Sequence, residues 1–157
     1  MFQYLFKKSE KPEVEKKYDV LKIENQLCFP LYACSREIIK MYKPFLDNID
    51  LTYTQYITML ILWEKGQASA KELGERLYLD SGTLTPLLKK LESKNLVKRR
   101  RSKEDERSLI VTLTEDGVAL KDKAVEIPAG MSKCVKLTSE ERATLRGLLD
   151  KLMDSCQ

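Results

Sequence analysis

The first long pattern in the chain is a stripe of apolar residues that recur three and four positions apart. It comprises Leu27, Leu31, Cys34, Ile38, Met41, Tyr42 and Phe45. This spacing is typical of one face of an amphipathic helix, which we expect to end between Pro44 and Asn48. Proline is tolerated in a first helical turn but not in a helix interior. Because Pro30 falls inside the stripe, the regular helix is expected to begin near Cys28 or Phe29, or to bend there.

Three further apolar segments follow, separated by turn residues. Residues 54–63 predict a second, mostly buried helix. Ser69 can cap a third helix, with Glu72 at the spacing of a capping box. After a short turn, Asp80 or Ser81 can cap a fourth helix that carries its leucines on one face. Two such helices joined by a short turn predict a helix-turn-helix unit.

A β-hairpin is predicted after the fourth helix, which Asn95 can end in a left-handed conformation. Residues 96–100 can form a strand, residues 101–107 are polar, and residues 109–113 are rich in the β-branched side chains of a returning strand. Together they predict a wing over residues 96–113. The expected fold class is therefore mainly α with a small β-wing, a winged helix-turn-helix.

Two more capping signals mark the C-terminal part of the chain. Thr114 precedes two acidic residues and can cap a helix that follows the wing. Thr138 and Glu141 have the spacing of a capping box that opens a last helix with a leucine stripe.

Charge is concentrated in one segment, although the net charge is only +4. Residues 89–108 hold nine basic side chains against four acidic ones, so the rest of the chain is close to neutral. Such a cluster is typical of a phosphate-binding surface, although a solvated charged face has the same composition. Combined with the helix-turn-helix and the wing, it predicts binding to double-stranded DNA.

The candidate DNA contacts come from the fourth helix and the wing. Short hydroxyl side chains reach phosphates and base edges, lysines neutralise phosphate charge, and arginines favour the minor groove. Thr83 and Thr85 could equally be helix caps or solvent-facing residues. The candidates are Ser81, Thr83, Thr85, Lys89 and Lys90 on the helix, and Arg101 and Arg107 on the wing.

Four cysteines, at positions 28, 34, 134 and 156, are the remaining candidates for chemistry. They form no CxxC pair and the chain has no histidine, so neither a metal site nor another cofactor is expected. Without histidine, a Ser or Cys hydrolase is not expected. We expect a DNA-binding protein and not an enzyme. The chain shows no signal-peptide or membrane-spanning pattern, so we expect a cytoplasmic protein with reduced thiols and no membrane partner.

Three stretches of sequence carry a resemblance to known proteins. They are ENQLCF at residues 24–29, LYLDSGTLTPLLKK at residues 77–90 and EDERS at residues 104–108. The chain resembles the MarR family of winged-helix regulators and, within it, the OhrR organic-hydroperoxide sensors. The resemblance implies a repressor that leaves its operator when an organic hydroperoxide oxidises Cys28. It also implies that Asp105 pairs with Arg107, which enters the minor groove.

The residues around Cys28 can be interpreted independently of that resemblance. A peroxide is attacked by the thiolate, which needs access and hydrogen-bond donors. Cys28 lies near the expected start of a helix, where free amides favour negative charge, and Tyr32 lies one turn further on the same face. The resemblance adds Tyr42 and Tyr53 as donors to the sulfur, although both could be ordinary packing residues.

Helix geometry sets a condition on Tyr42. It lies fourteen residues beyond Cys28, on the same face but roughly 21 Å away along the helix axis. A Tyr42 that serves the thiolate must therefore come from a second subunit with an antiparallel helix, which predicts a two-fold homodimer. The expected organisation is a flexible arm (1–17) and a single winged-helix chain (18–157), with dimerisation helices at 18–50 and 126–157 around a DNA-binding lobe at 51–125.

The fate of the oxidised sulfur stays open. Cys134 falls where some members of the resembling group place a second cysteine that forms an intersubunit disulfide, whereas others stop at a sulfenate and a small thiol. Cys34 is expected in the core and Cys156 at a frayed end. Three other functions are left open: a MarR-type repressor released by a small aromatic ligand, a thiol peroxidase, and an architectural DNA-binding protein.

Overall fold

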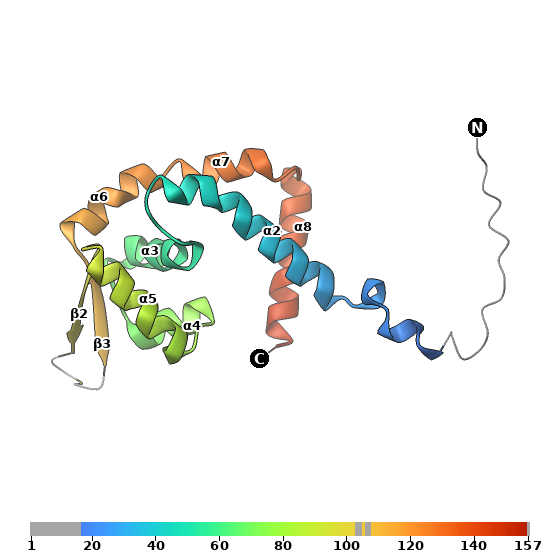
Figure 1. Ribbon diagram of the computed structural model, residues 1–157, viewed down its shortest axis with the longest axis horizontal. Helices are drawn as coiled ribbons and strands as arrows, with labels where there is room; N and C mark the ends of the chain where they lie inside the picture. The colour runs from blue at the N-terminus through green and yellow to red at the C-terminus, as the bar shows by residue number, and fades with distance from the viewer. Residues whose placement is uncertain (1–16, 103–104, 106–107, 157) are drawn as a thin grey trace. The chain divides into compact units, whose positions relative to one another are not determined.

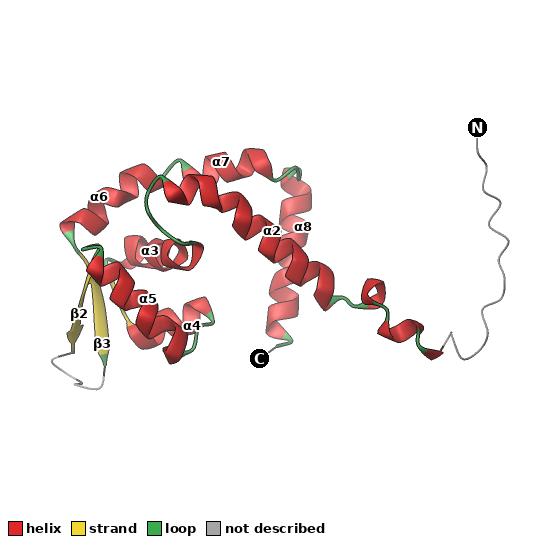
Figure 2. Ribbon diagram, in the orientation of Figure 1, coloured by secondary structure: helices red, strands yellow, loops and turns green. Residues whose placement is uncertain are grey.

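The computed structural model describes residues 17–102, 105 and 108–156. The chain divides into two units, one up to Lys40 and one from Met41. The described chain is mostly helical and contains one small sheet, which confirms the predicted fold class (Figures 1 and 2). The elements are η1 (Asp19–Leu21), η2 (Ile23–Asn25), α2 (Cys28–Asp47), α3 (Tyr53–Lys65), β1 (Gln67–Ser69), α4 (Ala70–Leu77), α5 (Ser81–Ser93), β2 (Val97–Arg101), β3 (Leu109–Leu113), α6 (Glu115–Ala124), α7 (Ile127–Cys134) and α8 (Ser139–Asp154).

The first unit contains η1, η2 and the start of α2. The side-chain amides of Asn25 and Gln26 tie the two short helices together, each donating to a backbone carbonyl of η1 at 2.6 Å. Helix α2 begins at Cys28, as predicted, and Pro30 occupies its first turn. The backbone N–H groups of a first turn have no helical partner, so proline costs no hydrogen bond there. The helix is continuous to Asp47.

The core of the second unit draws on α3, α4, α5 and two strands. Thr52 opens α3 through a capping box with Gln55, so the helix begins one residue earlier than predicted. Helices α4 and α5, joined by a short turn, confirm the predicted helix-turn-helix. Side chains from all five elements meet in one core, which holds them in a fixed arrangement. The largest fully buried apolar side chains are Met59, Leu62, Leu73, Leu88, Leu91, Val97 and Val111.

A three-stranded antiparallel sheet completes this unit, in the order β1-β3-β2. Val111, in the middle of β3, pairs with Ala68 on one side and with Arg99 on the other. The predicted hairpin is confirmed, although Arg101 is the last residue of β2 and not the first residue of the loop. Strand β1 was not predicted, because three residues are too few to show the alternation of a strand.

Helix caps follow the sequence signals with one exception. Thr138 and Glu141 form the complete capping box that their spacing predicted. Only half of the capping box predicted at Ser69 forms. The side chain of Ser69 accepts a hydrogen bond from the amide of Glu72, but the carboxylate of Glu72 binds the ammonium group of Lys65 and not the amide of Ser69. A charged donor within reach makes a stronger partner than a backbone amide. The side chains that accept a bond from a first-turn amide include Ser69, Asp80, Thr114 and Thr138.

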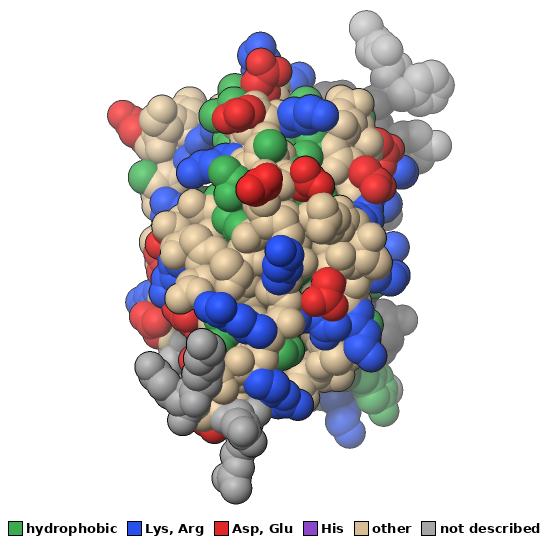
Figure 3. Space-filling view, turned by 90° about the vertical axis from the view of Figure 1, so that its left-hand side faces the viewer, with side chains coloured by type: hydrophobic (Ala, Val, Ile, Leu, Met, Phe, Trp, Pro, Cys, Tyr) green, Lys and Arg blue, Asp and Glu red, His purple; other side chains and the backbone are tan. Residues whose placement is uncertain are grey.

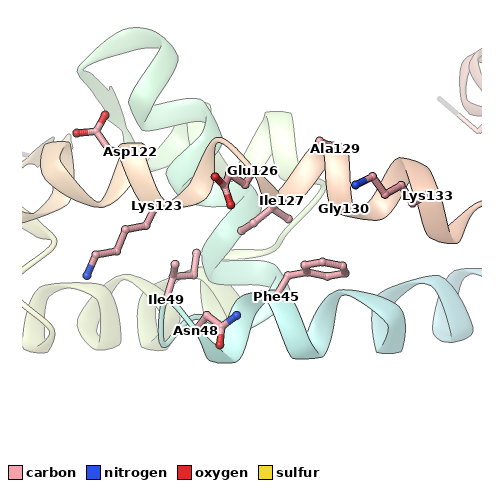
Figure 4. A pocket seen from close by; sticks show the side chains of 10 residues that line it. All are labelled: Phe45, Asn48, Ile49, Asp122, Lys123, Glu126, Ile127, Ala129, Gly130 and Lys133. Carbon is pink, nitrogen blue, oxygen red and sulfur yellow. The ribbon is translucent and has the colours of Figure 1, made fainter.

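The segment after the wing forms two helices where one was expected. Helix α6 ends at Ala124 and α7 begins at Ile127, which is buried together with Met131. The ring of Phe45 lies against Gly130, where an added Cβ would come within 2.4 Å of it (Figure 4). Glycine therefore allows the end of α2 to approach α7 closely. Helix α8 has no buried residue, and neither it nor any other described helix is long and apolar enough to span a bilayer.

Candidate functional site

Helix α5 exposes a polar face opposite its buried leucines. At its start, the carboxylate of Asp80 accepts hydrogen bonds from the amide of Thr83 at 2.9 Å and from its hydroxyl at 3.0 Å. These bonds hold the pKa of Asp80 below its ordinary value. The hydroxyl proton of Thr83 is thus used by the cap, and its oxygen can still accept a bond. The exposed side chains of α5 include all five that the sequence singled out: Ser81, Thr83, Thr85, Lys89 and Lys90.

The basic cluster contains both structural and exposed side chains. Arg99 holds one carboxylate oxygen of Glu92 through Nε at 2.9 Å and Nη2 at 2.6 Å, while its amide binds the other oxygen at 3.0 Å. These bonds lower the pKa of Glu92. Lys94 pairs with Asp50 at 2.7 Å. Two basic residues therefore stabilise the fold, whereas Lys98, Arg100 and Arg101 are exposed. In the view of Figure 3, basic side chains gather in the lower half of the surface.

The wing tip is described at Ser102, Asp105 and Ser108. The amide of Ser102 donates to the carbonyl of Ser108, and the amide of Ser108 donates to that of Asp105, each at 2.8 Å. These bonds close the tip of the hairpin. Arg107 lies outside the described residues, so its ion pair with Asp105 and its place in the minor groove stay predictions.

Cys28 is the first residue of α2, and its side chain is exposed. Tyr32 lies one turn further along the helix, and its hydroxyl accepts a hydrogen bond from Nη1 of Arg36 at 2.8 Å. The guanidinium group of Arg36 also lies over the ring of Tyr32, 5.5 Å from its centroid. Because this hydroxyl accepts from arginine, its own proton stays available for donation to an anion.

The structure brings Tyr42 and Tyr53 together in the second unit. Their ring centroids are 5.0 Å apart, and the ring of Tyr56 lies 6.0 Å from that of Tyr42. Burial, and then the proximity of Tyr42, raises the pKa of both Tyr53 and Tyr56. Trp63 follows at 6.4 Å from Tyr56. This row of rings leads from α2 through α3.

Tyr56 and Trp63 continue this row of rings, which the sequence did not predict. Their signal was present, because Tyr53, Tyr56 and Trp63 recur at helical spacing on one face of a single helix. The indole N–H of Trp63 donates to the carbonyl of Gly117 at 2.7 Å, which attaches α3 to the first turn of α6.

The other cysteines are also accessible. Cys134 is the last residue of α7 and is exposed, as a second redox residue would need to be. The expectation that Cys34 lies in the core is wrong for the single chain, where this thiol is exposed. A helical stripe identifies the apolar face of α2 but not what covers it.

Among the hollows on the described part of the second unit, two adjoin helices α6 and α7. The larger, of about 700 Å³, lies between the end of α2 and the helices α6 and α7, and charged side chains of both signs line it (Figure 4). The smaller, of about 320 Å³, has a mostly apolar wall that includes Tyr56, Leu60, Trp63 and Val125. Neither is lined by a cysteine.

Comparison with known proteins identifies the family. Residues 40–124 match the family of SarA/Rot transcriptional regulators. The chain is 51% identical over 142 residues to the organic hydroperoxide resistance transcriptional regulator of Bacillus subtilis, covering 90% of this chain and 97% of that protein.

Solved structures agree with this match. Reduced AbfR bound to DNA is 35% identical, with a TM-score of 0.74 over 90% of this chain and 99% of that one. A mutant of MarR from E. coli, in complex with operator DNA, is 27% identical, with a TM-score of 0.69 over 78% of this chain and 89% of that one. The chain therefore belongs to the MarR family of winged-helix transcriptional regulators and, within it, is similar to the OhrR organic-hydroperoxide sensors.

Proposed function

We propose that the chain is a redox-sensing repressor, which binds operator DNA as a homodimer while Cys28 is reduced and leaves it when an organic hydroperoxide oxidises Cys28. The observation that carries this proposal is an exposed thiol at the first residue of α2. This thiol lies in a chain that is 51% identical to an organic hydroperoxide resistance regulator.

The reaction needs only the thiolate and the peroxide. The sulfur of Cys28 attacks the terminal oxygen of the hydroperoxide, the O–O bond breaks, and the alkoxide takes up a proton and leaves as an alcohol. The sulfur becomes a sulfenic acid. A thiolate of Cys134 from the partner subunit can then displace hydroxide from that sulfur and form a disulfide.

Side-chain hydroxyls must supply most of the stabilisation of the Cys28 thiolate. Helix amides contribute less than usual, because Pro30 has no N–H and the amide of Phe29 already donates to the carbonyl of Gln26 at 3.3 Å. Tyr32 retains a free hydroxyl proton for this purpose. The partner subunit's Tyr42 and Tyr53 are the other proposed donors.

A dimer is supported by apolar side chains that the single chain leaves in water. On α8 these residues recur three and four positions apart, which forms a stripe suited to another helix. The first unit carries a second exposed set. A second copy of the chain covers both sets in the proposed dimer. They are Leu145, Leu148, Leu149 and Met153 on α8, and Val20, Leu21, Leu27 and Phe29 in the first unit.

DNA binding is assigned to α5 and the wing. Lys89 and Lys90 contact phosphates beside the major groove that receives α5, while Ser81 and Thr85 can reach phosphates or base edges. Thr83 serves as an acceptor, because its proton is held by Asp80. The wing brings Arg101 and Arg107 to the neighbouring minor groove.

Mapping the oxidised thiol tests the chemical half of the proposal. Reduced protein is treated with one equivalent of cumene hydroperoxide, and the sulfenic acid is trapped with dimedone before peptide mass spectrometry. The proposal expects the adduct at Cys28 ahead of the three other exposed thiols. An adduct that forms first at Cys34, Cys134 or Cys156 would contradict it.

The smaller hollow supports a second candidate function, a repressor released by a small aromatic ligand. Its wall offers the rings of Tyr56 and Trp63 for stacking. A parent protein that stays on DNA after hydroperoxide treatment but is released by an aromatic carboxylic acid would favour this function over the redox mechanism.

A further inference from the structure

The turn between α4 and α5 is closed by an unusual residue. Tyr78 adopts the left-handed conformation, with φ 53° and ψ 41°. The amide of Leu79 reaches back to the carbonyl of Gly74 at 2.9 Å, which is the hydrogen bond of a Schellman motif. Glycine is the usual residue at the left-handed position, because the Cβ of any other residue is crowded there.

Other residues with positive φ in the described part of the chain obey the usual preference. They are Asp50, Asn95 and Gly66. Asp and Asn tolerate this conformation because their short polar side chains can bond locally, and Gly has no Cβ. An aromatic side chain has neither advantage. The backbone at Tyr78 therefore carries a conformational cost that a change to asparagine would reduce.

Burial does not offset that cost. The side chain of Tyr78 is 67% exposed. Among the described residues, the ring takes part in none of the aromatic or cation–π contacts of the structure. A residue that is unfavourable for the backbone and adds little to the packing of the chain points to a partner outside the chain.

The position of Tyr78 indicates which partner. It lies two residues before Asp80, the N-cap of α5, and thus beside the end of the helix that enters the major groove in the proposed function. The nearby cations on α4 are already paired, since Lys71 lies 3.9 Å from Glu75 and Arg76 lies 3.1 Å from Glu64. An exposed phenol is therefore a prominent donor at this turn.

We infer that Tyr78 is a DNA-contacting residue, whose hydroxyl donates to a phosphate oxygen and whose ring packs on the adjoining deoxyribose at the edge of the groove that receives α5. This inference rests on the proposed DNA-binding function. Phosphate and sugar contacts fix the position of a protein on DNA without reading its sequence. Loss of Tyr78 should therefore weaken specific and non-specific binding to a similar degree.

The test compares Tyr78→Asn with Tyr78→Phe in the full-length reduced protein. The Asn variant keeps the left-handed turn, so its Tm should rise by about 2–4 °C, while its Kd for DNA should increase roughly tenfold. The Phe variant keeps the ring, so its Tm should stay unchanged and its Kd should increase roughly threefold. The probe is a labelled duplex that the reduced parent protein selects from random-sequence DNA, with binding followed by fluorescence anisotropy at fixed salt.

If Tyr78→Asn raises the Tm but weakens DNA binding, the lost affinity comes from a lost contact with DNA and not from a damaged fold. An Asn variant with the parent's Kd, or one whose Tm falls together with its affinity, would overturn the inference. Lys89→Ala serves as the separate test of the proposed function. If Lys89→Ala weakens binding and Tyr78→Asn does not, only the inference about Tyr78 fails. If neither variant weakens binding, the assignment of α5 to DNA fails as well.

Discussion

The rings of Tyr42 and Tyr53 lie 5.0 Å apart between centroids, so α2 and α3 bring together two of the tyrosines expected to serve the sensor sulfur. Burial, with a further contribution from Tyr42, raises the pKa of Tyr53 above its ordinary value of 10.0. Tyr53 therefore keeps its proton at neutral pH. A protonated phenol is a hydrogen-bond donor to a thiolate.

Replacing either hydroxyl should slow the sensor reaction without unfolding the protein. Tyr42→Phe and Tyr53→Phe keep the ring contact and remove only the donor. The rate of thiol loss with cumene hydroperoxide should fall by roughly tenfold or more in each, because a hydrogen bond to a charged group contributes about 1.5–3 kcal/mol. Tyr56→Phe, in the same row of rings, is the matched control and should react like the parent. Equal rates in all four proteins would assign Tyr42 and Tyr53 to packing alone.

The pair formed by Glu92 and Arg99 should make stability depend on pH. Hydrogen bonds from Arg99 lower the pKa of Glu92, so the folded state favours the carboxylate more than the unfolded state does. This contribution is fully present above the ordinary pKa of 4.5 and is lost as pH falls through the lowered pKa. Glu92→Gln should therefore unfold at lower urea than the parent at neutral pH, and this difference should shrink in acid.

Glu75→Gln provides the control for that experiment. Glu75 pairs with Lys71 at 3.9 Å, and both side chains are more than half exposed. Exposed pairs contribute little to stability. The Glu75 variant should follow the parent at both pH values. A difference between Glu92→Gln and the parent that does not change with pH would show that its origin is packing and not charge.

Gly117 should tolerate no side chain. A Cβ at this position would lie 2.0 Å from the carbonyl oxygen of Leu96, which is backbone and cannot rotate away. Gly117→Ala should destabilise the protein by roughly 3 kcal/mol in urea unfolding. Gly147, on α8, is the control, because a Cβ there meets nothing within 4 Å. Gly147→Ala should be stabilising by about 0.5–1 kcal/mol. Equal effects of the two changes would contradict the packing described at Gly117.

Local signals explain why much of the fold could be predicted from the sequence. Asp80, Thr114 and Thr138 cap helices because their side-chain oxygens satisfy amides a few residues away, and such contacts are visible as spacing. Asn95 likewise ends its helix in the left-handed conformation, at φ 56°. These features depend on neighbours in sequence, so no tertiary information is needed to find them.

Contacts between distant segments could not be predicted in the same way. The carboxylate of Glu72 binds the ammonium group of Lys65, seven residues earlier. The indole of Trp63 donates to the carbonyl of Gly117, which lies 54 residues further along the chain. The exposed residues of α5 were predictable because the leucine stripe defines the opposite, buried face. The ion pair between Arg99 and Glu92 could not be predicted. The composition of the wing does not show which arginine is held by a carboxylate of the same chain.

A non-reducing gel tests whether Cys134 resolves the oxidised Cys28. If the thiol of Cys134 attacks the sulfenic acid of the other subunit, hydroperoxide-treated protein should run as a covalent dimer on this gel, and Cys134→Ser should run as a monomer. Cys34→Ser, another exposed thiol, should behave like the parent. A covalent dimer that persists without Cys134 would identify a different partner, and a monomer in the parent would indicate that oxidation stops before an intersubunit disulfide.

Control of DNA binding by Cys28 can be measured in a single titration. Fluorescence anisotropy measures the Kd of the parent and of Cys28→Ser for the selected duplex, before and after treatment with cumene hydroperoxide. We expect both reduced proteins to bind. Treatment should weaken binding by the parent at least tenfold, which corresponds to about 1.4 kcal/mol, and should leave Cys28→Ser unaffected. Loss of binding by treated Cys28→Ser, or an unchanged Kd for the treated parent, would contradict it.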